Sequence, residues 1–417
     1  MWDNAPVWYP HGFWGGSVAD AAVGKMEAAL RAAMATEFYR HKFADADLTD
    51  FASLPTTSKA ELLGEPTRFL TQPESAYTRV HQTSGTSTGV PLKWYDTPRN
   101  WNAMLGCWAH YFGLAELAPA DVAFFPFSFG PFLGFWTAFE AAGQFGMRTV
   151  PAGGLSSTAR LRLMHDHSAT VVFCTPTYAL HLAEVARQQN ISLRGTVRKL
   201  IVAGEPGGAV AGTRDAIEAA WGARVLDHYG LTEVGPLAME AATHPGGLFL
   251  HDKAYFCEVL QPNSMEPAEF DTVGELVVTT LVRLDSPIIR YRTGDLVRPV
   301  RLPDGQRWLA GGILGRLDDM LHIRGNNVYP TAIETIIRRC AGLCEYRLLV
   351  DDTNPLADLV LEVEAADSAL LQTIANAIRD ALLFRCDVRA VDAGTLPRSE
   401  MKSRRIVKFS QRIHPPH

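Results

Sequence analysis

The sequence predicts an α/β protein with a large N-terminal domain, which has parallel sheets and a small β region, and a small α+β C-terminal domain. Between residues 121 and 227 strand-like and helix-like runs alternate, which is typical of a parallel sheet with crossover helices. Beyond about Gly246, short β-type runs are separated by Pro, Asp and Gly. From Asp319 on, the pattern returns to strands and helices over about 100 residues, enough for a separate domain. We place the domains at residues 1–317 and 318–417.

Capping and periodicity predict the first helices. A long helix is expected over residues 18–40, with Ser17 as its N-cap. Thr97 and Pro98 have the pattern of a cap and a first helical position. The helix that follows them should place four side chains in the core at helical spacing: Trp101, Leu105, Trp108 and Phe112.

The alternating region and the C-terminal part complete the expected elements. The expected strands of the alternating region are VAFFPF (122–127), TVVFC (170–174), KLIVAG (199–204) and ARVLD (223–227). The expected helices between them cover residues 132–145, a segment capped by Thr175 with Pro176 in its first turn, and residues 209–221. The runs AYFCEVL, GELVVTT, DLVRPV and RWLAG suggest a mainly antiparallel region. The last segment should contain a strand, a helix (331–339), two strands, a helix (367–384), a strand and a polar tail.

Composition narrows the class of protein. With 47% hydrophobic and 20% charged residues and a net charge of −6, the 417-residue chain has the balance of a soluble globular protein, with no electrostatic reason to expect nucleic acid as a partner. The N-terminus does not have the pattern of a signal peptide, and the most apolar stretch, residues 122–136, is too short for a membrane span. We therefore expect a cytoplasmic protein without membrane association. Six scattered cysteines without a C-x-x-C pair are expected to be buried apolar residues rather than zinc ligands or disulfides.

Residues 81–94, HQTSGTSTGVPLKW, are rich in small polar residues. Such a stretch could form a turn, a linker or a backbone cradle for phosphate, in which N–H and hydroxyl groups donate to anionic oxygens. It is not a Walker A loop, because G-x-x-x-x-G-K-[ST] is absent. The rest of the chain has to decide among these three alternatives.

Five further short stretches follow downstream, and each alone would be interpreted as a turn. AGEP and HYGLTE come directly after predicted strands, where open α/β sheets place ligands. The complete set is AGEP (203–206), HYGLTE (228–233), YRTGD (291–295), GRLDDMLHIRGNNVYPTAIE (315–334) and PRSEMK (397–402).

Taken in this order with the loop at 83–89, these stretches resemble the acyl-adenylate-forming enzymes, the superfamily of acyl-CoA synthetases, luciferases and peptide-synthetase adenylation domains. The likeness is greatest to the compact phenylacetate-CoA ligase branch and runs from about residue 80 to the end. It implies that the C-terminal domain is mobile and turns about a hinge at Asp318. It also implies that the loop closes over the β- and γ-phosphates of ATP.

The resemblance assigns nucleotide-binding roles to residues of each motif. TSGTSTG is one residue longer than the usual T-S-G-[ST]-T-G, so the donor among Thr86, Ser87 and Thr88 stays open. Tyr229 would stack on adenine, Asp295 would accept both ribose hydroxyls with its two oxygens, and Arg316 would lie beside ribose and phosphate. The full ATP-binding set is Ser84, Gly85, Thr86, Thr88, Gly89, Gly204, Glu205, Pro206, His228, Tyr229, Gly230, Asp295 and Arg316.

The same resemblance implies the catalytic groups. Thr232 and Glu233 would meet the α-phosphate and Mg²⁺, for which one carboxylate suffices because the ion keeps several waters. Lys402 matches the mobile catalytic lysine, although Met401 replaces the glycine that is common beside it. Gly325 would belong to the loop that enters for the thiol step.

The acyl group should bind at FFPFSFGPFLGFW (124–136), where phenylacetate ligases carry an aromatic- and glycine-rich stretch. Phe127, Phe129 and Phe132 are the candidates, with an ordinary aromatic core as the alternative. The several Gly and Pro residues favour a partly irregular wall over a regular strand. No charged residue in the stretch selects a second ionised group, so a compact aromatic acid fits best.

The sequence thus predicts an AMP-forming ligase that uses ATP and Mg²⁺ to activate a small aromatic acid and then transfers it to coenzyme A. One alternative keeps the adenylation but transfers to a carrier-protein phosphopantetheine, an amine or a hydroxyl. A second alternative, from another class, is a non-catalytic nucleotide-binding protein, against which the joint presence of Glu233, Asp295 and Lys402 argues. The acid and the oligomeric state stay open, a homodimer being one of the alternatives.

Overall fold

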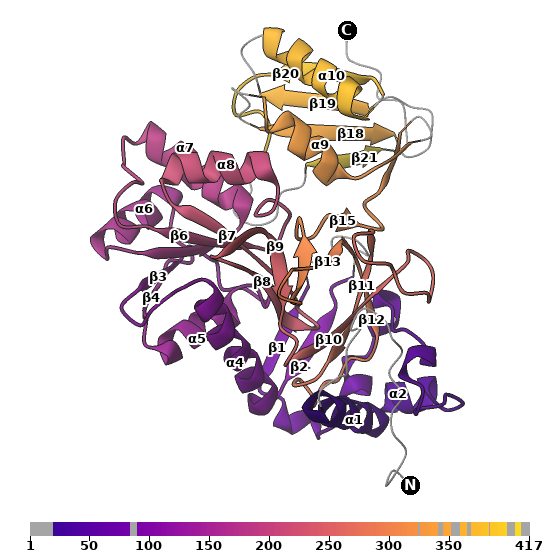
Figure 1. The fold of residues 1–417 in the computed structure, drawn as a ribbon. Helices are drawn as coiled ribbons and strands as arrows, with labels where there is room; N and C mark the ends of the chain where they lie inside the picture. The colour runs from indigo at the N-terminus through magenta and orange to yellow at the C-terminus, as the bar shows by residue number, and fades with distance from the viewer. Residues whose placement is uncertain are drawn as a thin grey trace.

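The computed structural model describes residues 20–83, 90–323, 326–340, 345–351, 359–364, 368–382, 384–397 and 405–409. Within these ranges the chain forms a mixed sheet of nine strands, two sheets of four strands and two separate hairpins (Figure 1). The predicted α/β class is confirmed, and helices cover both faces of the parallel part of the large sheet.

The expected long helix at the N-terminus is two helices, so that expectation was wrong. Helix α1 (Asp20–Ala35) ends before Thr36, and α2 (Glu37–Lys42) begins after it. The Thr36 hydroxyl accepts from the Tyr39 N–H (3.2 Å) and donates to the Ala33 carbonyl (2.7 Å). Thr36 therefore caps α2, a role that competes with a continuous helix. Short elements follow: η1 (Phe51–Ser53), α3 (Lys59–Leu62), η2 (Pro66–Phe69) and η3 (Glu74–Ala76).

The nine-stranded sheet has the order β13-β14-β9-β8-β7-β6-β5-β3-β4. From β7 to β4 all neighbouring strands are parallel, as the alternating pattern predicts, and from β7 to β13 they are antiparallel. Its strands are β3 (Val122–Phe125), β4 (Arg148–Pro151), β5 (Val171–Cys174), β6 (Lys199–Ala203), β7 (Arg224–Leu231), β8 (Gly235–Ala241), β9 (His244–Leu250), β13 (Pro299–Arg301) and β14 (Arg307–Ala310).

Five helices pack around this sheet, and two of them begin as the sequence predicts. Thr97 caps α4 by accepting from the Asn100 N–H (3.1 Å), and Thr175 caps α7 in the same way through Tyr178 (3.1 Å). The four side chains expected on α4 are all buried in the largest hydrophobic core. The helices are α4 (Pro98–Leu114), α5 (Trp136–Phe145), α6 (Ser157–Asp166), α7 (Pro176–Gln188) and α8 (Ala211–Trp221).

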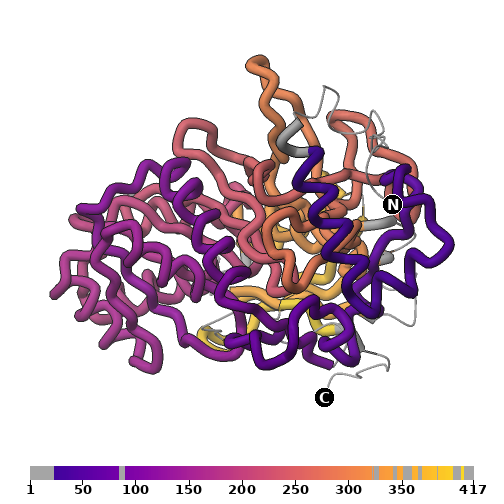
Figure 2. The backbone as a smooth tube through the Cα atoms, turned by 90° about the horizontal axis from the view of Figure 1, so that it is seen from below, coloured from indigo at the N-terminus to yellow at the C-terminus, as the bar shows by residue number. Residues whose placement is uncertain are grey.

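An antiparallel sheet of order β10-β11-β12-β15 lies beside the large sheet, as the texture beyond Gly246 predicts. Figure 2 shows helix α1 lying across this side of the molecule, where Lys25 Nζ donates to the Lys253 carbonyl (2.7 Å). The strands are β10 (Tyr255–Leu260), β11 (Gly274–Thr280), β12 (Tyr291–Val297) and β15 (Gly315–Arg316). Its last strand ends at Arg316, just before the C-terminal part of the chain.

The C-terminal part forms its own sheet, of order β20-β19-β18-β21, and its own hydrophobic core. The tail expected to be polar contributes a strand, because β21 (Ile406–Phe409) pairs in parallel with β18. The remaining elements are β16 (Leu321–Ile323), β17 (Asn326–Val328), α9 (Pro330–Ile337), β18 (Tyr346–Asp351), β19 (Leu359–Glu364), α10 (Ser368–Leu382) and β20 (Cys386–Val391).

This unit contacts the large sheet's helices through α9 and α8 (Figure 1). The Thr213 hydroxyl donates to Glu334 Oε1 (3.3 Å). Gly212 approaches so closely that an added Cβ would lie 2.6 Å from the Arg338 Cβ. A glycine is needed at position 212 for this arrangement.

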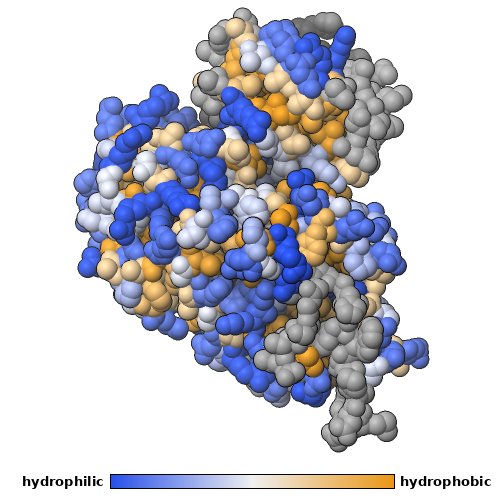
Figure 3. All heavy atoms as spheres, in the orientation of Figure 1, coloured by the Kyte–Doolittle hydropathy of each residue, from blue (hydrophilic) through white to orange (hydrophobic). Residues whose placement is uncertain are grey.

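The surface is consistent with the composition. Figure 3 shows hydrophilic residues over much of the visible face, with smaller hydrophobic areas between them. Among the described residues, no helix has both the length and the apolar character that a membrane span needs. Whether the domains divide at Asp318 stays a prediction.

The segment after β3 is irregular, as the Gly and Pro residues predict, and Gly134 is essential to its packing. Gly134 has φ +39°, and a Cβ there would lie 2.3 Å from Phe127 Cζ. We expect Gly134→Ala to lower the free energy of unfolding by about 1–3 kcal/mol, because it overpacks the site. Thermal or urea unfolding would measure the change.

Gly143→Ala is the matched control, since Gly143 lies in the exposed part of α5 with no atom within 4 Å of an added Cβ. There the same substitution should stabilise the protein by about 1 kcal/mol through helix propensity. A Gly134→Ala variant as stable as Gly143→Ala would contradict the packing described.

Candidate active site

Several predicted site residues lie where the nine-stranded sheet adjoins the antiparallel sheet β10-β11-β12-β15. β6 and β7 are parallel neighbours, with Ala203 paired to His228, so the segments after their ends lie side by side. Asp295 on β12 is paired with Arg316 on β15. The carboxyl edge of the parallel sheet, where α/β proteins place ligands, therefore faces the edge of the antiparallel sheet.

Tyr229, Asp295 and Arg316 are in direct contact. The Tyr229 hydroxyl donates to Asp295 Oδ2 (2.5 Å), and Arg316 donates to Asp295 Oδ1 (3.0 Å). Arg316 also donates from Nε to Asp318 Oδ1 (3.0 Å). Burial raises the pKa of Asp295, while Arg316 and the Tyr229 hydroxyl oppose this shift. The structure thus gathers three residues that the sequence places in three separate motifs.

Thr232 and Glu233 follow β7 and are held from two directions. The Thr232 carbonyl accepts from Arg283 (2.8 Å), and Glu233 Oε1 accepts from the buried Tyr291 hydroxyl (2.6 Å). Glu233 is 3% exposed, and no described residue donates to its second oxygen, Oε2. A carboxylate oxygen suits a hard cation that takes its other ligands from phosphates and water. Among the described residues, no three His, Cys, Asp or Glu side chains are grouped so that they could hold a metal ion.

The AGEP stretch turns sharply after β6. Gly204 has φ +95°, and Glu205 Oε1 accepts from the Thr177 N–H (2.8 Å) in the first turn of α7. A carboxylate is favourable at a helix N-terminus. The side chain of Glu205 is therefore directed to α7, while the neighbouring Gly204 and Pro206 are exposed.

Asp227 joins this region although the sequence did not single it out. Cβ atoms added to Gly208 and Gly312 would lie within 2.4 Å and 3.2 Å of its carboxylate oxygens. Burial and the neighbouring Glu240 raise the pKa of Asp227 to about 7. It precedes Tyr229 by two residues on β7, so both side chains are on one face of the strand.

His228 lies apart from the other predicted nucleotide residues. It points to the opposite face of β7, where its ring stacks on Trp108 at a centroid distance of 4.4 Å. Burial lowers the pKa of His228 to about 3, so the imidazole is neutral. Gly230, by contrast, is exposed beside Tyr229, where an added Cβ would lie 2.8 Å from the Gly235 carbonyl oxygen.

The candidate acyl wall is a half-buried group of rings. Phe127 and Phe129 meet edge to face (5.2 Å between centroids), and Phe129 also contacts Trp136 (4.7 Å) and Phe139 (5.0 Å). Phe132 makes no ring contact with another described residue. The structure therefore brings two of the three candidates together.

Several predicted residues lie outside the described ranges. These are Ser84, Gly85, Thr86, Thr88 and Gly89 of the phosphate loop, Gly325 and Lys402. The described chain stops at Pro397 and resumes at Arg405, and both residues line a hollow of about 20 Å³ together with Thr177. The Thr177 N–H also donates to Glu205, so the described residues Pro397 and Arg405 lie near the AGEP stretch.

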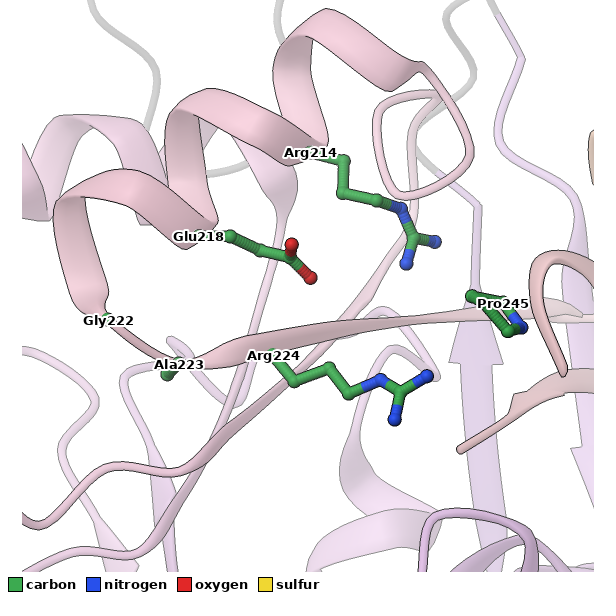
Figure 4. A pocket seen from close by; sticks show the side chains of 6 residues that line it. All are labelled: Arg214, Glu218, Gly222, Ala223, Arg224 and Pro245. Atoms are coloured by element: carbon green, nitrogen blue, oxygen red, sulfur yellow. The ribbon is translucent and has the colours of Figure 1, made fainter. Parts of the chain in front are cut away.

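A larger hollow, of about 450 Å³, lies away from the candidate site, between α8 and the start of β7. Figure 4 shows Arg214, Glu218 and Arg224 around it, at the amino end of β7 and the last turn of α8. Arg214 donates to the Gly208 and Val225 carbonyls, and Glu218 accepts from the Val225 N–H, so these side chains fix α8 to the sheet. The hollow is at the opposite end of β7 from Tyr229.

Sequence reasoning did not identify three residues that hold the site: Asp227, Arg283 and Tyr291. Tyr291 begins the YRTGD stretch, so its place in a motif was a usable signal. For Arg283 the sequence offered no signal other than a basic residue next to a β-type run, because its hydrogen-bond partners are distant in sequence.

Comparisons with known proteins identify the family of the chain. Residues 35–281 match the family described as AMP-binding enzyme, and residues 325–409 match the AMP-binding enzyme C-terminal domain. The phenylacetate-coenzyme A ligase of Escherichia coli is 31% identical over 394 residues, which cover 88% of this chain and 89% of the relative. The ligase of the same name from Thermus thermophilus is 31% identical, with 85% of each protein covered.

Solved structures are similar as well. A 2-hydroxyisobutyryl-CoA ligase in the postadenylation state, in complex with 2-HIB-AMP, has a TM-score of 0.87 and 25% identity, covering 98% of this chain and 93% of that chain. The same ligase in the thioesterification state, with 2-HIB-AMP and CoA, has a TM-score of 0.70 and 27% identity at the same coverage. The chain therefore belongs to the AMP-binding enzyme family of acyl-adenylate-forming enzymes, and it is an AMP-forming acid–thiol ligase of the acyl-CoA ligase type.

Proposed function

We propose that the acid activated by this ligase is a compact aromatic acid such as a benzoate or a phenylacetate, with coenzyme A as the acceptor. The observation that supports this choice is the wall formed by Phe127, Phe129 and their ring neighbours after β3. β3 lies in the same parallel sheet as β6 and β7, so its carboxyl end opens at the same edge as the candidate nucleotide residues. The relatives named phenylacetate-coenzyme A ligase support the same substrate class.

The wall selects by shape rather than by charge. Arg160 donates to Ser128 Oγ (3.3 Å), next to Phe127 and Phe129 in the chain, but it also donates to the Ala152 carbonyl and the Tyr178 hydroxyl. Each of its three nitrogens thus has a protein acceptor. A flat, uncharged ring is the group that suits edge-to-face aromatic contacts.

The nucleotide roles follow the contacts already described. Tyr229 would stack on adenine between the Gly204–Pro206 turn and Gly230. Asp295 would accept the ribose hydroxyls, since each of its oxygens keeps a lone pair beyond its bond to Tyr229 or Arg316. The residues 84–89 would donate to the β- and γ-phosphates, and Asp227 would lie beside the adenine.

In the first half-reaction the acid's carboxylate attacks the α-phosphorus in line, pyrophosphate leaves and an acyl-adenylate forms. No protein nucleophile takes part, so catalysis rests on positioning and on charge stabilisation. Thr232 would donate to the α-phosphate, and Lys402 would neutralise charge between carboxylate and phosphate. Glu233 would hold Mg²⁺, which supplies positive charge at the phosphates when bound.

In the second half-reaction the coenzyme A thiol attacks the acyl carbonyl and AMP leaves. We propose that the C-terminal domain turns about Asp318 between the two steps, which removes Lys402 and brings in the Gly325 loop. The higher TM-score to the postadenylation state than to the thioesterification state of one ligase supports an adenylation-type arrangement here. The Thr213–Glu334 hydrogen bond belongs to this arrangement.

An acid panel tests the proposed substrate. Acyl-CoA formation would be measured with benzoate, phenylacetate, 2-hydroxyisobutyrate and a straight-chain acid, each with Mg-ATP and coenzyme A. An aryl acid should give the highest kcat/KM, by at least about tenfold, because ring contacts and ring burial together are worth about 1.4 kcal/mol or more. A higher value for either aliphatic acid would contradict the aromatic assignment.

Phe129→Ala should raise the KM for the preferred aryl acid by roughly tenfold, because Phe129 is the ring with most neighbours in the wall. The KM for ATP should not change, since the nucleotide residues lie on other loops. Phe270→Ala is the control, because Phe270 is an exposed ring that lies under Arg301 and not in the wall. If both variants behave alike, or if ATP affinity falls with that for the acid, the wall is structural.

Lys402→Ala should reduce acid-dependent pyrophosphate release by about 10²–10³-fold, the usual loss when one electrostatic donor is removed from a transition state. Thioester formation from supplied acyl-adenylate should be largely kept. The exposed Lys253 provides the control, as Lys253→Ala should leave both half-reactions intact. Near-normal pyrophosphate release by Lys402→Ala would remove Lys402 from the mechanism.

A further inference from the structure

Among the described strands, the β1–β2 hairpin (Arg79–Gln82 and Lys93–Asp96) forms a separate two-stranded sheet. Its two strands pair with each other, and within the described residues neither joins a larger sheet. A two-stranded hairpin is only marginally stable by itself, so contacts with other segments set its position. The Gln82 N–H donates to the Pro131 carbonyl (2.8 Å), and side chains make the further contacts. This matters because the two strands flank the Ser/Thr/Gly segment.

Arg283 makes the most deeply buried of these contacts. Both Arg283 and Asp96, the last residue of β2, are 0% exposed. Arg283 Nε donates to Asp96 Oδ1 (2.7 Å) and a terminal nitrogen donates to Oδ2 (2.6 Å), which is the bidentate geometry of a guanidinium on a carboxylate. The remaining nitrogen donates to the Thr232 carbonyl (2.8 Å). One planar group thus joins β2 to the backbone of Thr232.

Two neighbours of Arg283 in the same loop strengthen its attachment to the hairpin, but not its attachment to the turn after β7. Ser286 donates to the Tyr95 carbonyl (2.8 Å), and Asp285 accepts from the Thr97 hydroxyl (2.6 Å). These bonds fix residues 283–286 to the hairpin and to the start of α4, but they do not reach β7. Arg283 alone in this group extends to Thr232.

We infer that Arg283 is a positioning residue for adenylation: it fixes the backbone of Thr232 relative to β2 and thereby sets the direction of the Thr232 hydroxyl. Burying an ion pair brings little net stability, because the lost hydration offsets most of the attraction. A rigid fork with three directed bonds is instead suited to holding two segments in one geometry. The inference rests on the proposed function, because Thr232 is assigned there to the α-phosphate.

The test compares Arg283→Lys with Arg290→Lys. Arg290 is a closely matched control: it is 1% exposed, binds Glu258 through two nitrogens (3.0 and 2.8 Å) and donates to the Leu54 carbonyl (2.6 Å), but its partners are not in the site. Both substitutions keep the charge and lose the fork, so both should lower the melting temperature by similar amounts. Only Arg283→Lys should reduce kcat for acid-dependent pyrophosphate release, by about ten- to a hundredfold.

A double-mutant cycle separates positioning from a general loss of structure. In the Thr232→Ala background, Arg283→Lys should cost less than about threefold in pyrophosphate release, because the group that it positions is gone. Its effect on the melting temperature should persist unchanged. If Arg283→Lys does not fold, Asp96→Asn replaces it, since this isosteric change removes one of the two anchors of the guanidinium.

The outcomes distinguish the inference from the proposed function. An equal rate loss in Arg283→Lys and Arg290→Lys, or the same factor with and without the Thr232 side chain, would overturn the positioning role. Absence of acid-dependent pyrophosphate release by the unmodified enzyme with every acid would instead overturn the proposed function. A selective loss that disappears in the Thr232→Ala background supports the inference.

Discussion

The hydrogen bond between the Tyr229 hydroxyl and the Asp295 carboxylate joins the nine-stranded sheet to the antiparallel sheet β10-β11-β12-β15, at the point where the candidate nucleotide residues lie. Tyr229 belongs to the last parallel strand, and Asp295 to the middle of the antiparallel sheet. Arg316 completes the contact and leads directly into the C-terminal part of the chain. The Asp295 carboxylate thus connects the parallel sheet with the antiparallel sheet. Through Arg316 it is also close to the start of the C-terminal part, which is the mobile unit of the proposed mechanism. Burial of a carboxylate is tolerated here because a guanidinium and a hydroxyl are bonded to it.

Much of the fold could be predicted from local sequence, because its signals are local. Thr97 and Thr175 cap their helices as predicted, and the alternating hydrophobic runs form the parallel strands. The predictions of secondary structure were wrong where tertiary contacts, and not the local sequence, determine the conformation. Thr36 could be a helical residue as well as a cap, and its choice depends on where α1 and α2 pack. Residues 406–409 become a strand because β18 offers a free edge, which the short sequence IVKF does not reveal.

The candidate site was predictable to the extent that its residues lie in motifs. Tyr229, Asp295 and Arg316 were assigned from separate stretches, and the structure brings them into contact. His228 belongs to the same motif as Tyr229, yet the two-residue period of a strand directs it to the core. Arg283 and Tyr291 act through partners 187 and 58 residues away, and such pairs cannot be read from spacing. The phosphate loop, Gly325 and Lys402 stay predictions from sequence.

The central claim is that Asp295 receives the ribose at the junction of the two sheets, and nucleotide binding tests it most directly. Calorimetry would give the Kd of ATP and of 2′-deoxy-ATP for the unmodified enzyme and for Asp295→Asn. A hydrogen bond to a charged group contributes about 1.5–3 kcal/mol, so the unmodified enzyme should prefer ATP by about tenfold or more. In Asp295→Asn the preference should shrink to about threefold or less. An unchanged preference in the variant would contradict the account.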